Sequence, residues 1–431
     1  MTDIIEDGIP GWQRNLIVIW IAQFVALAGF SVCAPILPLY VRELGAETDQ
    51  AVRLWSGIIF SAPAVSLAIF SPIWGALSDR MGRKIMFVRA AFGGAAVIGL
   101  MGLVTNVQQL AVLRTLQGML TGTVTASTVL VATTVPKSRT GASLGMLQMA
   151  IYAGSSAGPL LGGFIADTFG YRVTFYVTSA LLVMTGVATS LYVRERAAPK
   201  TERAAPRPER AQAGTPAAPR RVRTPVSWFV GLRNGSWRAA LQSPAASVLI
   251  GVLVINLLTR LGPSIITPVL ALFVESLAPA GAPVASLAGL VSGASAAAGA
   301  VGSWLMGRMS DRLGFRPILN ICTFICVASY ALHYAAPSVG VLMGLQAVTG
   351  FAMGGILSAF SAYLASVAPQ GQEGTVYGIS ASISSTGQAI GPVIGSALSV
   401  WSGLRLPFLF ASATMAASGI YSSLLGRRRG R

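Results

Sequence analysis

The sequence predicts an all-α membrane protein in which twelve transmembrane helices form two pseudo-symmetric bundles of six. Only 10% of the 431 residues are charged, whereas soluble domains carry about 25%. Twelve spans of about 20 residues need about 240 residues, which this chain can supply. Glycine-rich motifs occur twice, since the segments that begin at Gly75 and Gly154 recur at Gly307 and Gly387. Such a repeat is typical of two bundles built on one plan.

Apolar runs and the breaks between them place the predicted helices. The first six are expected at 14–40, 53–77, 85–104, 109–135, 141–166 and 172–193. The second six are expected at 244–274, 285–308, 317–335, 339–367, 374–398 and 405–425. The chain thus divides into an N-terminal bundle, 1–193, and a C-terminal bundle with a basic tail, 244–431.

The segment 194–243 is predicted to be a cytoplasmic linker between the bundles. It is rich in Arg, Ala and Pro and has too few apolar residues to form a core. Its last part, 226–241, contains tryptophan and arginine residues that suit either a short interfacial helix or an irregular tether.

The distribution of Lys and Arg predicts the orientation in the membrane. Most of the 31 basic residues fall in loops on one side, in the linker or in the tail. The other side holds Arg42, Arg53, Arg172 and Arg405. Basic residues accumulate in cytoplasmic loops, so we expect a multi-pass protein of the inner (plasma) membrane with both termini in the cytoplasm. The net charge of +17 is explained in this way, and no nucleic-acid partner is expected.

The sequence argues against an enzyme, a metal transporter and an ATP-driven pump. The three cysteines lie inside apolar runs and have neither a disulfide nor a zinc-site pattern. The chain has no glycine-rich nucleotide loop, no metal-ligand cluster and no nucleophile triad. We therefore expect no cofactor and no bound metal.

Two of the repeated segments have side chains suited to conformational change. In the segment from Gly75 to Lys84 the glycines permit a tight turn, and Asp79 is placed to pair with arginine or to meet a helix N-terminus. The alternative is an ordinary turn with basic anchors. The candidate gating residues are Gly75, Asp79, Arg80, Gly82, Arg83, Asp311 and Arg312.

The fifth predicted helix contains glycines four residues apart. Gly154, Gly158 and Gly162 fall on one helix face, and small residues let neighbouring helices approach closely. Pro159 removes a backbone donor and bends the helix. This pattern fits static packing, movement or both.

Together these segments resemble the major facilitator superfamily and its twelve-helix bacterial drug:proton antiporters. The segment from Gly75 to Lys84 matches the loop signature between the second and third helices of that family. The runs at 113–118 and 154–163 resemble its fourth-helix and fifth-helix motifs. The residues 35–45 resemble the end of its first helix, and the opening at 12–18 resembles one multidrug-exporter branch. The resemblance implies the major facilitator fold and an antiporter role at the bundle interface for the fifth helix. It also implies that Asp79 belongs to a charge cluster between the bundles that forms in one transport state and breaks in the other.

Arg114 and Arg260 are the only ionisable side chains expected deep within spans, because all fourteen acids fall near span ends or in loops. A charge at mid-membrane is costly and normally faces water or a bundle interior. Snorkelling to the outer face is the alternative for Arg114. The helices numbered 1, 4, 7 and 10 line the cavity in the family, which makes Gln23, Arg114, Asn256, Arg260 and Gln346 the candidate substrate-binding residues. Weaker candidates are Gln148, Tyr152, Tyr377 and Gln388. Each amide is equally suited to tying helices together.

The sequence thus predicts a secondary active transporter that exports small amphipathic compounds, with protons moving inward. Its expected partners are a small-molecule substrate, protons and membrane lipids, and we expect a monomer. The missing mid-span carboxylate departs from many proton-coupled exporters of the family. An organic-anion exchanger or facilitator therefore stays open, as does a non-transporting membrane scaffold or sensor.

Overall fold

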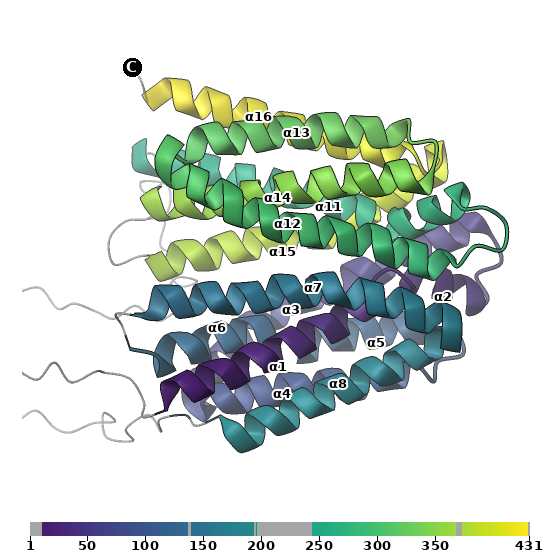
Figure 1. The fold of residues 1–431 in the computed structure, drawn as a ribbon, viewed down its shortest axis with the longest axis horizontal. Coiled ribbons are helices and arrows are strands. Elements are labelled where there is room, and N and C mark those ends of the chain that lie inside the picture. The colour runs from purple at the N-terminus through teal and green to yellow at the C-terminus, as the bar shows by residue number, and fades with distance from the viewer. Residues whose placement is uncertain (1–10, 137–138, 194, 196–243, 368–372, 430–431) are drawn as a thin grey trace, which may run out of the picture.

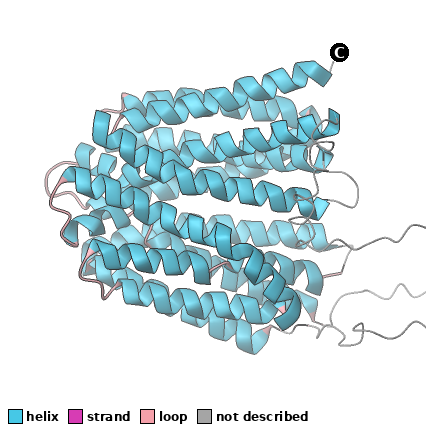
Figure 2. Ribbon diagram, turned by 180° about the vertical axis from the view of Figure 1, so that it is seen from behind, coloured by secondary structure: helices cyan, strands magenta, loops and turns pink. Residues whose placement is uncertain are grey.

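The computed structural model describes residues 11–136, 139–193, 195, 244–367 and 373–429, which form helices and short connections without a strand (Figure 2). The first half contains α1 (Trp12–Val32), α2 (Leu37–Glu43), α3 (Asp49–Met81), α4 (Arg83–Met101), α5 (Val107–Leu120), α6 (Thr123–Thr134), α7 (Thr140–Phe169) and α8 (Tyr171–Tyr192). The second half contains α11 (Pro244–Leu277), α12 (Val284–Leu313), α13 (Phe315–Tyr334), α14 (Val339–Val367), α15 (Glu373–Ser402) and α16 (Leu406–Arg429). The linker and its 226–241 segment lie outside the described residues.

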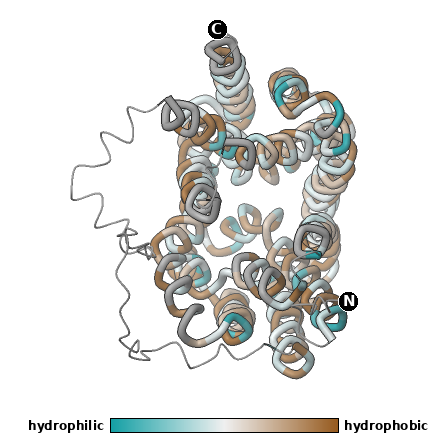
Figure 3. The backbone as a smooth tube through the Cα atoms, turned by 90° about the vertical axis from the view of Figure 1, so that its left-hand side faces the viewer, coloured by the Kyte–Doolittle hydropathy of each residue, from teal (hydrophilic) through white to brown (hydrophobic). Residues whose placement is uncertain are grey.

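The helices run along the long axis of the molecule, with the first half beside the second (Figure 1). Figure 3 views the helices end-on, down the long axis of the molecule. Within the described ranges, nine helices are each long and apolar enough to span a membrane. The other three predicted spans correspond to α5 followed by α6, to α15 and to α16. The predicted all-α fold of two six-helix bundles is confirmed.

Two of the helices that the sequence predicts as continuous are interrupted. The first, 14–40, ends as α1 at Val32 and resumes as α2 at Leu37. Pro35 lies in this gap, and a proline both lacks an N–H and disfavours helical geometry in the residue before it. The fourth, 109–135, breaks where Thr121 is extended (ψ −175°) and Gly122 has a φ of 134°.

The two ends of the molecule differ in charge. The end where α4 begins holds Arg83, Lys84 and Arg316, and we call it the basic end. The opposite end holds acids that include Glu43, Glu47, Asp49, Asp167 and Glu275, and we call it the acidic end. Both names are used below without reference to the sides of a membrane.

Each half has its own apolar core. In the first half Tyr40 and Phe175 pack with ring centroids 5.1 Å apart, and in the second Phe273 and Phe408 pack at 5.0 Å. Leu272 of the second half is buried within the core of the first half, near the acidic end. The halves are therefore separate bundles that share apolar contacts near the acidic end.

Candidate functional site

A cavity of about 310 Å³ lies between the halves, and both halves contribute its wall. Its lining comes from α3 and α5 of the first half and from α11 and α15 of the second. The apolar part includes Phe60, Leu67 and Pro392. The polar part includes Arg114 and a set of hydroxyl and amide groups. This volume lies at the lower end of the range for small-molecule sites.

Arg114 on α5 is held in place by two hydrogen bonds. Its Nε donates to the Ile59 carbonyl oxygen at 3.1 Å, and its Nη1 donates to Gln117 Oε1 at 2.6 Å. The Ile59 carbonyl is available because Pro63, four residues later, has no N–H to donate. Gly118 lets α5 approach α3, since a Cβ there would lie 2.6 Å from the Cα of Pro63. A guanidinium has five N–H groups, so three remain for a ligand.

The second half presents oxygen acceptors to the same cavity. Ser264, Thr267 and Ser385 each donate their hydroxyl hydrogen to a carbonyl one turn earlier on their own helix, at 2.8, 3.2 and 3.1 Å. Their oxygen lone pairs stay free to accept hydrogen bonds. Gln388 adds an exposed amide to this wall. The cavity thus combines a fixed cation, neutral hydroxyl groups and apolar surface.

Arg260 lies one turn from the cavity-lining Ser264, on the side of the basic end. Its Cβ packs against Gly387 of α15, and Tyr152 of α7 is close enough for an electrostatic interaction. No carboxylate among the described side chains forms an ion pair with Arg260. This arginine borders the cavity instead of lining it.

The three predicted amides occupy different environments. Asn256 donates to the carbonyl and hydroxyl oxygens of Ser380 at 2.9 Å and to Ser384 Oγ at 3.0 Å, so it ties α11 to α15. Gln23 on α1 is fully buried, and its amide has no hydrogen-bond partner among the described residues. Gln346 is buried on α14. None of these three lines the cavity.

The predicted gating segment is only partly within the described side chains. The side chains of Asp79, Arg80 and Asp311 lie outside the described ones, and so do the surroundings of Gly75. The side chain of Tyr377, a weaker binding candidate, also lies outside them. Gly82 separates α3 from α4 with a φ of 99°, which favours glycine. Arg312 is exposed at the basic end.

The carboxylate of Glu195, which is not among the predicted site residues, caps the start of α4. The backbone N–H groups of Arg83 and Lys84 donate to Glu195 Oε1 and Oε2, each at 2.9 Å. Glu195 follows α8, so this contact ties the end of the first half back to the segment at 75–84. A negative charge at a helix N-terminus satisfies free N–H groups and is favoured by the helix dipole.

The predicted glycine face of α7 packs within the first half. A Cβ at Gly154 would lie 2.9 Å from the backbone nitrogen of Ala28, and Gly158 and Gly162 likewise contact α1. Pro159 lies at the interface between the halves, where a Cβ at Gly289 of α12 would overlap its carbonyl oxygen. The helix α7 therefore joins its own bundle by its glycine face and the other bundle through a neighbouring face.

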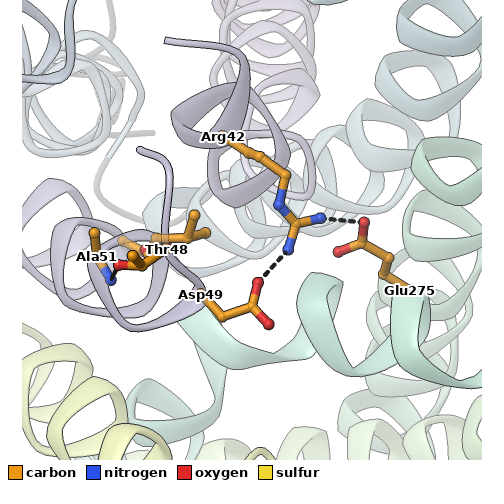
Figure 4. Close-up of polar contacts among 7 residues, drawn as sticks. Arg42, Thr48, Asp49, Ala51 and Glu275 are labelled. Carbon is orange, nitrogen blue, oxygen red and sulfur yellow. Dashed lines mark hydrogen bonds and ion pairs between the residues drawn. The ribbon is translucent and has the colours of Figure 1, made fainter. Parts of the chain in front are cut away.

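Polar contacts close the acidic end between the halves. Arg42 of α2 forms ion pairs with Asp49 of α3, at 3.0 Å, and with Glu275 of α11 (Figure 4). Asp167 of α7 accepts from the backbone N–H groups of Ala285 and Ser286 at 3.3 and 2.6 Å. At the opposite end, the described residues of α6 pack on their own half and make no extensive contact with the second half. Within the described residues, these contacts between the halves close the acidic end.

Arg89 is a further arginine inside a helix that the sequence predicts as a span, close to the start of that helix at the basic end. It lies within α4, where its guanidinium stacks 3.6 Å from the ring centroid of Trp74 and donates to the Leu120 carbonyl oxygen at 3.1 Å. The sequence shows this charge inside an apolar run, but its distance from the loop is short enough to suggest a membrane-surface anchor.

The chain resembles a family of known proteins over nearly its whole length. The sequence profile of the Major Facilitator Superfamily matches residues 19–278 and 252–431. The "Multidrug resistance protein MdtG" of Enterobacter lignolyticus (strain SCF1) is 32% identical over 425 residues, covering 99% of this chain and 95% of that protein. The MdtG of Dickeya zeae (strain Ech586) is 31% identical over 426 residues, covering 98% of this chain and 97% of that protein.

Solved structures share the fold at much lower sequence identity. A bacterial homologue of the human lysosomal transporter Spinster, in an inward-facing and unoccupied conformation, has a TM-score of 0.73 and 15% identity, with 97% of each chain covered. The human organic anion transporter MFSD10 (TETRAN) has a TM-score of 0.66 and 17% identity, with 96% of this chain and 100% of that chain covered. At these identities the likeness concerns the fold alone.

Proposed function

Because this chain belongs to the Major Facilitator Superfamily, we propose that it exports small amphipathic compounds, including drugs, in exchange for protons. The family predicted from the sequence motifs is confirmed, and the chain is a multi-pass membrane protein. Similarity to multidrug resistance proteins over nearly the full length supports drug export. Transport of this kind is secondary, with two bundles rocking about a central site.

The observation that best supports this function is the cavity between the halves. A fixed guanidinium from one half faces hydroxyl oxygens from the other, beside apolar side chains. Such a wall suits a compound with an apolar body and a hydrogen-bonding group. Because the wall comes from both bundles, relative movement of the bundles changes both access to the cavity and contacts with the ligand.

We assign the basic end to the cytoplasm, because basic residues accumulate on that side of membrane proteins. The closed acidic end then faces outward, and the structure corresponds to an inward-facing state. In this assignment the contacts of Arg42 and Asp167 with the second half form the outer gate, and they must separate when the cavity opens outward.

The outer gate yields a prediction with a matched control. Glu275→Gln removes the ion pair of Arg42 that joins the two halves, whereas Asp49→Asn removes its pair within the first half. Exposed pairs contribute about 0.2–1 kcal/mol, so Glu275→Gln should shift the equilibrium toward the outward-open state by about 1.5- to 5-fold. Thiol labelling, from the outer side, of a cysteine introduced at Thr267 in the wall of the cavity between the halves measures this shift. Equal labelling of the two variants would argue against the gate.

A second candidate function is organic-anion exchange. One observation favours it. Arg114 lines the cavity and Arg260 borders it, whereas all acids fall near helix ends or in loops. An exchanger needs no proton flux, so proton movement distinguishes the two candidates.

Arg260 provides a prediction about substrate charge. If this arginine attracts the substrate, Arg260→Ala should reduce transport of anionic compounds far more than that of cationic ones, because a charge-assisted hydrogen bond contributes about 1.5–3 kcal/mol. Arg260→Lys should restore part of the loss, since it keeps the charge but loses the planar fork. The measurement is uptake of paired anionic and cationic compounds per folded protein. Equal losses for both classes would instead mark Arg260 as a structural group.

The proposed function is tested directly in everted vesicles that contain a pH-sensitive dye. Adding a transported amphipathic compound should release protons from the acidified vesicle lumen and accumulate the compound inside. Vesicles without the protein provide the background. Accumulation of anionic compounds without proton movement would favour the exchanger, and the absence of both signals across a broad compound set would reject transport.

A further inference from the structure

The break between α5 and α6 is specific to the first half. In the second half the corresponding helix, α14, runs without interruption from Val339 to Val367. The residue that corresponds to Gly122 there is also a glycine, Gly354, at the repeat offset of 232. A glycine alone is therefore insufficient to break this helix, and other residues must stabilise the interruption.

Two side chains from neighbouring helices donate hydrogen bonds to the carbonyl groups at the end of α5. Trp74 Nε1 on α3 donates to the Met119 carbonyl oxygen at 2.6 Å, and Arg89 Nη1 on α4 donates to that of Leu120 at 3.1 Å. In a continuous helix these two carbonyls accept from residues four positions later. The side chains thus replace the hydrogen bonds that the break removes, which is necessary for buried backbone groups within a membrane.

The second half lacks both donors. At the same offset, Met306 takes the place of Trp74 and Ile321 takes the place of Arg89. Neither methionine nor isoleucine can donate a hydrogen bond to a carbonyl. The half with the two donors has the broken helix, and the half without them has the continuous one.

We propose that Trp74 and Arg89 form a carbonyl clamp that keeps α5 and α6 as two separate segments, and that the break serves as a hinge in transport. The clamp holds the end of α5, which carries the cavity-lining residues Arg114 and Gly118 and is followed by the cavity-lining Thr121. The segment α6 turns at Gly122 while this wall stays in place. Trp74 and Arg89 are positioning residues, since neither lines the cavity, and their role in transport rests on the proposed function.

The test compares clamp variants with a matched aromatic–arginine pair. Trp74→Phe keeps a ring for Arg89 but removes the N–H, and Arg89→Lys keeps the charge but loses the fork. We expect Trp74→Phe to lower the maximal export rate about three- to tenfold, with Arg89→Lys affected less and the affinity for a transported dye within about twofold of wild type. Trp304 and Arg308 of α12 stack at 4.3 Å, and among the described residues neither donates to a carbonyl at a helix break. The variants Trp304→Phe and Arg308→Lys should therefore export at the wild-type rate.

A second measurement needs no transport. Spin labels at Val112 on α5 and Val124 on α6, both exposed, report the geometry across the break. A continuous helix would separate these backbone positions by about 18 Å. In the double variant Trp74→Met with Arg89→Ile, which carries the residues of the second half, the distance distribution should move toward that value.

An unchanged distance distribution in the double variant would overturn the clamp, and wild-type export by Trp74→Phe would overturn the hinge. If the wild-type protein exports nothing, the proposed function fails while the distance measurement still decides on the clamp. If the double variant does not fold, Trp74→Phe carrying the same two labels provides the distance readout.

Discussion

Replacing Arg114 with alanine is expected to lower export about 10- to 100-fold per folded protein. A hydrogen bond to a charged group contributes about 1.5–3 kcal/mol, and 1.4 kcal/mol corresponds to a factor of ten. Arg114 is the cation that lines the cavity, and its contacts with Ile59 and Gln117 fix its direction. Initial rates of dye export at several dye concentrations, normalised to folded protein, measure the loss.

Two further variants separate binding from folding. Arg114→Lys keeps the charge but loses the planar fork, so it should retain part of the activity. Thr115→Ala changes the next residue, an exposed side chain that bonds only to its own helix, and should be neutral. If Arg114→Ala retains full export, Arg114 does not bind the substrate. If Arg114→Lys folds normally and Arg114→Ala lowers the yield of folded protein but not the export rate per folded protein, the role of Arg114 is to hold α5 against α3.

Replacing Gly158 with leucine is expected to disrupt the packing of α7 on α1. A Cβ at Gly158 would lie 2.6 Å from that of Ser31, and it would also overlap the Ala28 carbonyl oxygen. Overpacking of this kind costs about 1–3 kcal/mol. For a bundle of this size 1 kcal/mol lowers the melting temperature by about 2–4 °C, so a decrease of about 2–12 °C is expected in detergent, together with lower export.

The same helix supplies the control for this substitution. Gly145 has open space around it, and leucine has a higher helix propensity than glycine. Gly145→Leu should therefore leave the melting temperature unchanged or raise it slightly. Equal destabilisation by both variants would mean that loss of a glycine, rather than close packing on α1, causes the effect.

Much of the fold follows from sequence because hydropathy and repeats act over long segments. Twelve apolar runs and the paired motifs at Gly75 and Gly307 suffice for two bundles of six helices. Local interruptions depend on single contacts instead. The proline in the first run was a visible signal for the gap before α2, whereas the break at Gly122 depends on Trp74 and Arg89, which reach it from two other helices.

The candidate site was only partly predictable for the same reason. Arg114 stands out because a charge inside a span requires a polar environment, and the structure places it in the cavity wall. Asn256 belongs to the same class of buried polar residues, but its partners Ser380 and Ser384 are more than 120 positions away. The serine and threonine residues that complete the wall, such as Thr267, carry no signal in sequence, because hydroxyl groups are common in spans and bond to their own helix.

The accessibility of one cavity residue tests the central claim most directly. Thr267 is exposed and lines the cavity, while the native cysteines Cys33, Cys322 and Cys326 are buried and can be replaced by alanine. In this background, Thr267→Cys should react with a membrane-impermeant thiol reagent from the cytoplasmic side in everted vesicles, and a transported compound should slow the reaction. Reaction from the outer side should rise when an inward proton gradient drives export. Labelling that no transported compound slows, or access from only one side under all conditions, would contradict alternating access through this cavity.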